Sequence, residues 1–174
     1  MAVLPVIIAP DPRLKVRCQP VAAVDADVRR LMDDMAESMH AAEGIGLAAT
    51  QVGVHQRVIV VDVHDKDAPR NPLRMANPEL AWASEETMLS HEGCLSLPEH
   101  YADLERPARV RVRYLDHENE MREIEAEGLL ATCIQHEMDH LDGILFVDHL
   151  SALKRNIILR KLAKTKRQVE KVAV

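Results

Sequence analysis

Apolar residues that recur every three or four positions predict three helices in this chain. The first follows Asp25, a good N-cap, and its buried stripe is Val28, Leu31, Met32, Met35, Met39 and Ala42. The second is expected between Gly128 and Gly143, because acidic residues precede its start and a glycine follows its end. The third, capped by Ser151, is expected to turn five apolar residues inward: Leu153, Ile157, Ile158, Leu162 and Val169.

Shorter runs of β-branched or alternating residues predict strands. Residues 57–63 form a β-branched run, and residues 109–115 alternate before a turn leads the chain back through residues 121–126. Two further short strands are expected at 73–77 and 80–83, on either side of an Asn-Pro turn. We therefore expect an α+β fold, in which small antiparallel or mixed sheets pack around the second helix, with an N-terminal and a C-terminal helix.

Composition narrows the class of protein. The chain has 174 residues, 47% hydrophobic and 29% charged, as expected for a single folded domain spanning residues 1–174. Only four aromatic residues are present, which argues against stacking platforms for single-stranded nucleic acid. Three unpaired cysteines favour a reducing compartment, and neither a signal peptide nor an apolar run of membrane-spanning length is seen. We expect a cytoplasmic protein without a membrane partner, and a monomer as the default.

Charge is unevenly distributed along the chain. Residues 154–171 contain eight basic residues and one acidic residue, a net +7, so the remainder carries −13 of the overall −6. This contrast suggests that the C-terminal helix, within residues 151–174, meets an anionic partner. A solvated helix face explains the same charges equally well.

The most informative motif is His136-Glu137-Met138-Asp139-His140 within the second predicted helix. Residues four apart share one face of a helix, so both imidazoles can reach one metal ion with the Glu137 carboxylate beside it. Two histidines need a third protein ligand, and its identity distinguishes the classes of enzyme that use this motif.

The chain offers several candidates for that third ligand. One protease class would place a histidine where this chain has Phe146, which cannot bind a metal. Downstream, Glu170 lies in the basic tail, and His149 stands on a predicted turn. Upstream, Cys94 has small neighbours that leave room for a metal, and Cys/His/His coordination would leave a fourth position open for water. Cys94 could equally be a buried packing residue.

A glycine-rich stretch, residues 44–53, follows the first helix. It lacks the Gly-Lys-Ser/Thr ending of a phosphate-binding loop, so it is either a plain turn or a backbone that another chain approaches closely. Gln51 is its one residue suited to chemistry, because an amide can donate a hydrogen bond to a developing negative charge.

Three stretches together resemble the bacterial-type peptide deformylase family. They are Gly44-Ile45-Gly46-Leu47-Ala48-Ala49-Thr50-Gln51, Glu92-Gly93-Cys94-Leu95-Ser96 and Gln135-His136-Glu137-Met138-Asp139-His140. The resemblance runs from residue 11 to about residue 155. It implies hydrolysis of the N-formyl group on the starting methionine of newly made proteins, which releases formate.

The resemblance also implies roles for individual residues. Cys94, His136 and His140 would hold one divalent metal that lowers the pKa of water, with iron(II) the usual working ion and zinc, nickel or cobalt as alternatives. Glu137 would act as general base and then general acid. The Gln51 amide and the Leu95 backbone N–H would stabilise the oxyanion.

By the same resemblance, the substrate main chain would add as a strand between the Gly44–Gly46 loop and the segment around Glu92–Cys94, and its methionine would fill an apolar pocket. The residues implied in substrate binding are Gly44, Ile45, Gly46, Glu92, Gly93, Leu129 and Cys133, with the ring of His136. Ser90 and Thr132 stand where many relatives carry larger aliphatics, and Tyr101 where some carry arginine. These departures bear on substrate preference and leave the chemistry untouched.

Two other functions fit parts of the pattern. A metallopeptidase would cleave ordinary peptide bonds, but this chain lacks the further ligand of those classes. A binding protein with a structural metal would need four protein ligands, and the sequence offers no evident fourth.

The basic C-terminal helix suggests a contact with ribosomal RNA, because some bacterial relatives of the resembled family use a C-terminal helix in this way.

Overall fold

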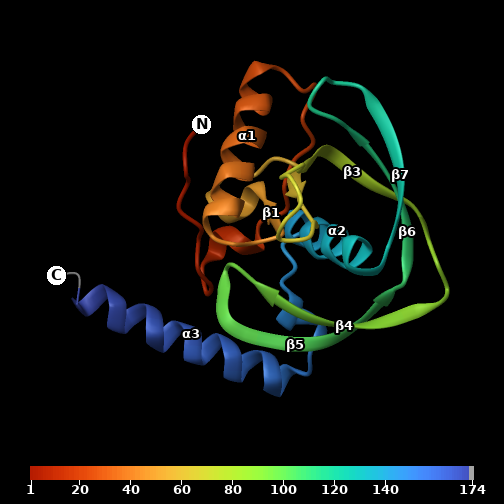
Figure 1. The fold of residues 1–174 in the computed structure, drawn as a ribbon. Helices are drawn as coiled ribbons and strands as arrows, with labels where there is room; N and C mark the ends of the chain where they lie inside the picture. Colours follow the sequence, from red (N-terminus) through yellow and green to blue (C-terminus); the bar gives the residue numbers. More distant parts are fainter. Residues whose placement is uncertain (173–174) are drawn as a thin grey trace.

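The computed structural model describes residues 1–172 (Figure 1). In chain order the elements are the 3₁₀ helix η1 (Pro12–Lys15), α1 (Ala26–Ala41), β1 (Gly46–Ala48), η2 (Ala49–Val52), β2 (Val58–Val61), β3 (Leu73–Ala83), β4 (Thr87–Cys94), β5 (Leu97–Pro107), β6 (Arg109–Leu115), β7 (Met121–Glu127), α2 (Gly128–Leu141), η3 (Phe146–His149) and α3 (Ala152–Val172). The expected α+β class and its three helices are confirmed. Each helix begins within a residue or two of its predicted start.

Two antiparallel sheets frame the molecule. The larger has the strand order β1-β2-β3-β6-β7, so β1 and β7 are its edge strands. The smaller is the hairpin of β4 and β5. Helix α2 lies between them, with β6 and β7 on one side, the hairpin below it and α1 with β1 on the other side (Figure 1).

The burial of α2 follows from this central position. Its buried residues include both apolar and polar side chains: Ala131, Thr132, Cys133, Ile134, Gln135, His136, Glu137, His140 and Leu141. Ala131, Ile134 and Leu141 pack against the inner face of the larger sheet, in one core with Met75 and Val112. His136 and His140 instead meet the hairpin, through Glu92 and Cys94 of β4, which is where the site forms.

The expected pair of short strands around Asn77 is wrong, because β3 is one continuous strand. The chain passes Asn77 with a φ of 50° and a shift in register against β6, which marks an irregularity within the strand. The Asn77 amide accepts from the Val21 backbone N–H at 2.9 Å and donates to the Val21 carbonyl at 2.8 Å. Asparagine tolerates this left-handed conformation, so the turn-like dipeptide becomes a bulge.

The hairpin of β4 and β5 was not predicted. Few of its residues are fully buried, because both of its faces are partly open to solvent. Its sequence therefore lacks the clear alternation that identified residues 109–115.

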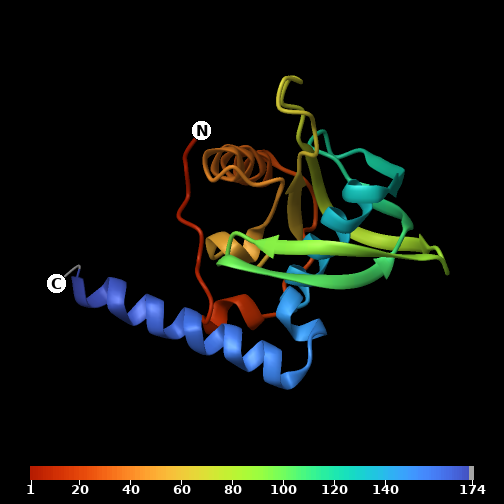
Figure 2. The same cartoon turned by 60° about the horizontal axis from the view of Figure 1, so that its bottom comes forward.

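The predicted inner face of α3 is partly wrong. Ile158 and Leu162 do pack on the core around Leu104 and Phe146. Leu153, Ile157 and Val169 are instead 71%, 41% and 64% exposed. The reason is geometric: α3 crosses the base of the molecule and runs past it, so only a narrow stripe meets the body (Figure 2).

Two glycines with positive φ flank α2 and offer a matched test of the fold. At Gly143, with φ of 74°, an added Cβ would clash with the Lys15 backbone, 2.7 Å from its carbonyl carbon. At Gly128, with φ of 61°, an added Cβ would meet nothing within 4 Å. We predict that Gly143→Ala lowers the free energy of unfolding by about 3 kcal/mol, through backbone strain and overpacking.

Gly128→Ala should cost only the strain, about 1 kcal/mol. Urea denaturation of both variants measures the difference. Equal losses for the two variants would contradict the assigned contact between Gly143 and the Lys15 backbone.

Candidate metal centre

Cys94, His136 and His140 come together at the centre of the molecule. Each offers a ligand atom, and the three atoms lie within 4.8 Å of one another. Cys94 ends β4, while the two histidines lie one turn apart on α2. They are the one such group of three or more metal-binding side chains found among residues 1–172.

The spacing of these atoms fits a tetrahedral metal. Cys94 Sγ lies 3.3 Å from His140 Nε2. Two ligands at the usual zinc–sulfur and zinc–nitrogen lengths, set at the tetrahedral angle, are about 3.5 Å apart. The His136 ring bonds through Nδ1 to Glu92, at 2.9 Å, which leaves its other nitrogen for a metal. The residues present therefore fit the metal that the motif implies.

The electrostatics of the two histidines also suit a bound cation. Burial lowers the pKa of His140 well below its usual range, so its imidazole stays neutral and able to coordinate. Burial opposes charge on His136 too, but hydrogen bonds to Cys94 and Glu92 and the charge of Glu137 outweigh it. They raise the pKa of His136 well above its usual range. Surroundings that favour an imidazolium would favour a divalent cation for the same reason.

Glu92 holds His136 in place rather than projecting freely into solvent. Its buried carboxylate accepts a hydrogen bond from His136 Nδ1. It also forms a bidentate ion pair with Arg106, whose Nε and Nη2 lie 2.5 and 2.9 Å from the two carboxylate oxygens. Burial works against this charge, but the hydrogen bonds from His136 and Arg106 prevail and lower the pKa of Glu92 to about 2. Ser90 adds a hydroxyl that donates to the same carboxylate at 2.9 Å. The polar Ser90, noted in the sequence as a departure, thus supports the charge of Glu92.

Gln51 is fixed beside the cysteine. Its Oε1 accepts from the Ala48 backbone N–H at 2.9 Å, and its Nε2 donates to Ser96 Oγ at 3.0 Å and lies 3.6 Å from Cys94 Sγ. The amide is therefore oriented with its donor toward the metal site. Leu95 lies in the turn between β4 and β5, packed over Gly44, where a Cβ would come within 2.8 Å of Leu95 Cδ1.

Glu137, unlike Glu92, has no charged partner at bonding distance among residues 1–172. It is buried, and its Oε2 has no hydrogen-bond partner among the described residues; the same holds for His140 Nδ1. Burial raises the pKa of Glu137 to about 7. A carboxyl group with this pKa can both take up and release a proton near neutral pH.

A cavity of about 450 Å³ opens onto this centre. Every residue assigned to substrate binding from the sequence lines it, and so do Cys94, Leu95, His136 and Glu137. Gly46 is essential to its shape, because a Cβ there would lie 2.5 Å from Glu137 Oε1 and 2.7 Å from Cys133 Sγ. Gln51 and His140 are close to the site but are not part of the cavity wall.

Comparison with known proteins decides the family. A family model described as polypeptide deformylase matches residues 3–156. The chain belongs to this family. The family consists of hydrolases that remove the N-formyl group from nascent peptides.

Individual relatives agree over nearly the whole chain. The peptide deformylase of Methylocella silvestris is 57% identical over 94% of this chain and 85% of its own length. That of Phenylobacterium zucineum is 54% identical, covering 94% and 97%. The crystal structure of the Ehrlichia chaffeensis peptide deformylase in complex with actinonin has a TM-score of 0.92 at 42% identity, covering 96% of this chain and 99% of that chain.

Three residues of the site were not predicted as functional. Ser96 lies within a quoted motif but was given no role, although it anchors Gln51. Arg106 and Asp139 are joined at 3.0 Å, yet they come from β5 and α2, 33 residues apart. Nothing in a single sequence links an arginine on an unpredicted strand to a helix so far away.

Proposed function

We propose that this chain hydrolyses the N-formyl group on the initiating methionine of newly made proteins, yielding formate and a free α-amine. The observation that carries the proposal is the meeting of a Cys/His/His group with a buried Glu137 whose Oε2 has no partner among the described residues, beside a cavity that Cys94, His136 and Glu137 line. Cys94, His136 and His140 would hold the metal, which when bound activates water and polarises the formyl carbonyl.

The remaining steps fall to side chains and backbone of this chain. Glu137 would take the proton of the attacking water and return it to the leaving amine, as its pKa near 7 allows. The Gln51 Nε2–H and the Leu95 backbone N–H would donate to the oxyanion that forms on the formyl carbon. Ser96 keeps the Gln51 amide in the required orientation.

The substrate would enter as an added strand. Strand β4 has one edge free of pairing, and β1 is an edge strand of the larger sheet, so two open edges border the cavity. A peptide main chain could pair with residues near Gly44–Gly46 and near Glu92–Gly93. The methionine side chain would then rest on Ile45, Leu129 and Cys133, and on the ring of His136.

For the metal, we propose iron(II) in the working enzyme. Thiolate and imidazole ligands also accept zinc, nickel or cobalt, so the ligand set alone does not choose among them. Protein purified without oxygen is expected to contain about one iron per chain and to lose activity on exposure to air. Elemental analysis paired with an activity assay checks this, and a fully active anaerobic protein holding only zinc would overturn it.

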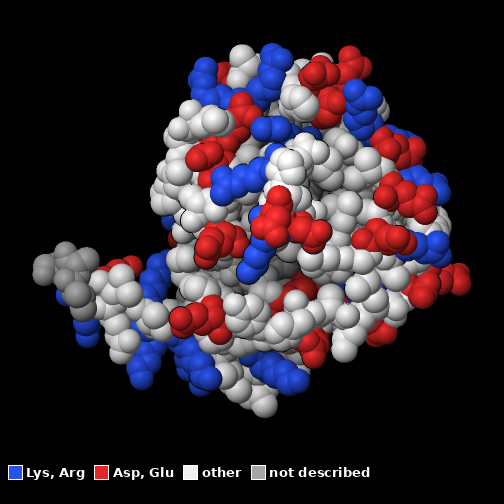
Figure 3. Space-filling model, in the orientation of Figure 1, with Lys and Arg blue, Asp and Glu red and all other residues white. Residues whose placement is uncertain are grey.

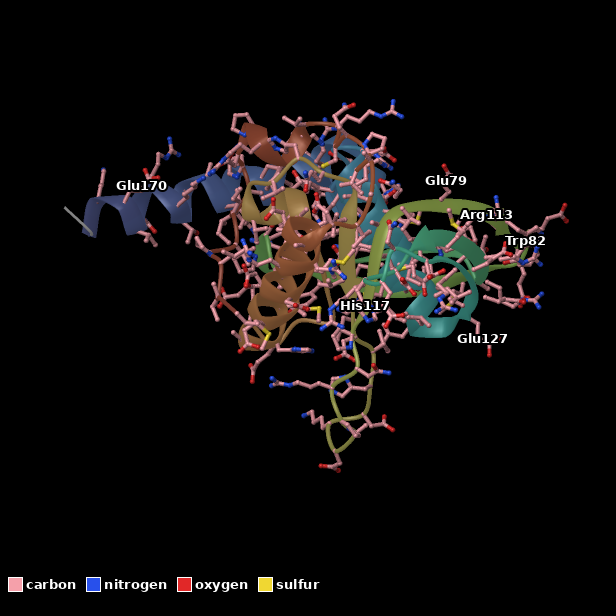
Figure 4. The ribbon with its side chains drawn as sticks, turned by 90° about the horizontal axis from the view of Figure 1, so that it is seen from above. Glu79, Trp82, Arg113, His117, Glu127 and Glu170 are labelled. Atoms are coloured by element: carbon pink, nitrogen blue, oxygen red, sulfur yellow. The ribbon has the colours of Figure 1, made fainter. Side chains whose placement is uncertain are left out.

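Replacement of Glu137 tests the reaction itself. Glu137→Gln should retain the metal but lower turnover of a formyl-methionyl peptide about 10²–10⁴-fold, because general acid–base catalysis is lost. The control is Glu79→Gln, on an exposed residue of β3 whose side chain projects outward (Figure 4) and does not line the cavity. The unformylated peptide should not be cleaved by any of these proteins. Normal turnover by Glu137→Gln would refute the assigned role, and cleavage of the unformylated peptide would point to a metallopeptidase.

We further propose that α3 contacts ribosomal RNA. Lysine and arginine side chains gather along this helix, while the rest of the chain is acidic (Figure 3). The helix is held against the body by Ile158 and Leu162 and by Lys166, whose Nζ donates to the Ile8 and Pro10 carbonyls. Most of its other basic side chains are left for a polyanion.

Deletion of residues 155–174 should abolish co-sedimentation with ribosomes at low salt, and should leave turnover of a short formyl-peptide within about threefold of the full chain. Rising salt should weaken binding of the full chain, because phosphate contacts release counterions. Undiminished co-sedimentation of the truncated protein would exclude this role for α3.

The described helices include none long and apolar enough to cross a membrane. Because nascent chains would be its substrate, we propose that the protein acts in the cytoplasm. One chain supplies every residue of the proposed site, so we propose a monomer in which residues 1–174 form one catalytic domain.

A further inference from the structure

His149 has no role in the chemistry above, yet it is joined to the metal centre. It lies in η3, a few residues after the metal-binding helix, and does not belong to the Cys94–His136–His140 group. Its Nε2 lies 2.9 Å from Asp139 Oδ2. The same carboxylate oxygen accepts from Arg106 Nη1 at 3.0 Å.

From Arg106 the contacts continue inward to a metal ligand. Arg106 binds both oxygens of Glu92, and Glu92 Oε1 lies 2.9 Å from His136 Nδ1. Exposure falls along this path. The side chains of His149 and Asp139 are 42% and 23% exposed, whereas those of Arg106 and Glu92 are 7% and 3%. An unbroken series of polar contacts thus leads from the surface to His136.

The geometry of Arg106 gives Asp139 a specific task. A guanidinium is a rigid plane, and two of its nitrogens already grip Glu92. The third nitrogen contacts Asp139, which is the neighbour of His140 on α2. Arg106 is thereby fixed relative to the helix that carries both histidines. His149 contacts Asp139 from the outer side and restricts that carboxylate to the position in which it meets Arg106.

We propose that Asp139 and His149 are positioning residues for the metal ligand His136, acting through Arg106 and Glu92. The proposal rests on the proposed function only in treating His136 as a ligand. Residues that orient metal ligands typically change metal affinity about 10–100-fold when replaced. The competing explanation is that the His149–Asp139 contact merely ties η3 to α2. In that case its loss would lower thermal stability and leave metal retention unchanged.

The test measures how fast a chelator removes Ni²⁺ from the loaded full-length protein, which needs no catalysis. Asp139→Asn is expected to speed Ni²⁺ release about tenfold. This is the low end of the range for residues that orient metal ligands, because Asp139 acts on His136 only through Arg106 and Glu92. His149→Phe should speed it about threefold, as expected for one lost hydrogen bond. His149→Gln keeps a side-chain donor and should restore slow release.

The matched control is His117→Phe. His117, labelled in Figure 4, lies in the turn after β6 with its side chain 51% exposed, and the carboxylate nearest to it is Glu118, which is not part of this path. The His117→Phe variant should release Ni²⁺ at the rate of the unchanged protein. Melting temperatures of all variants distinguish a loss of folding from a loss of metal. If Asp139→Asn does not fold, the comparison of His149→Phe with His149→Gln still tests the proposal.

Wild-type release rates in folded His149→Phe and Asp139→Asn would overturn the proposal, as would equally fast release from His149→Phe and His149→Gln. An absence of deformylase activity, with the release rates as expected, would instead count against the proposed function and leave the positioning role standing.

Discussion

The structure depends on one buried ion pair, between Glu92 on β4 and Arg106 on β5. Two ions taken out of water are stabilised only when each finds several partners, and here each does. Arg106 meets Glu92 and Asp139, while Glu92 also meets His136 and Ser90. Through Asp139 and His136 these two residues tie the hairpin to α2, which brings Cys94 of β4 close to the histidines of the helix.

The same pairing explains why the central helix can be polar. His136, Glu137 and His140 are buried, and burying polar groups is costly unless their bonding capacity is used. Nδ1 of His136 is satisfied by Glu92, whereas Oε2 of Glu137 and Nδ1 of His140 have no partner within the described chain. The two unsatisfied atoms belong to side chains at the proposed metal centre, whereas the contact with Glu92 fixes the ring of His136. One polar contact thus orients a proposed ligand, while the neighbouring atoms stay available for a metal or substrate.

Sequence reasoning succeeded where periodicity or spacing is local. Helical stripes placed α1 and α2, and four-residue spacing put His136 and His140 on one face. It failed where tertiary contacts decide. Helix α3 carries apolar residues on the outside because little of the body lies beneath it, and the hairpin of β4 and β5 has no clear alternation because neither face is fully covered. Arg106 and Asp139 could not be predicted, since their partners are fixed by the packing of two elements distant in sequence.

Edge strand β1 and the unpaired side of β4 give the proposed binding mode a consequence for the protein itself. Unpaired strand edges are templates on which another chain can build a sheet, including a copy of the same protein. Here both edges border one cavity, so a single peptide lying in it would occupy both at once. The edges proposed to bind the substrate are therefore also edges on which a molecule without substrate could pair with another copy of the chain.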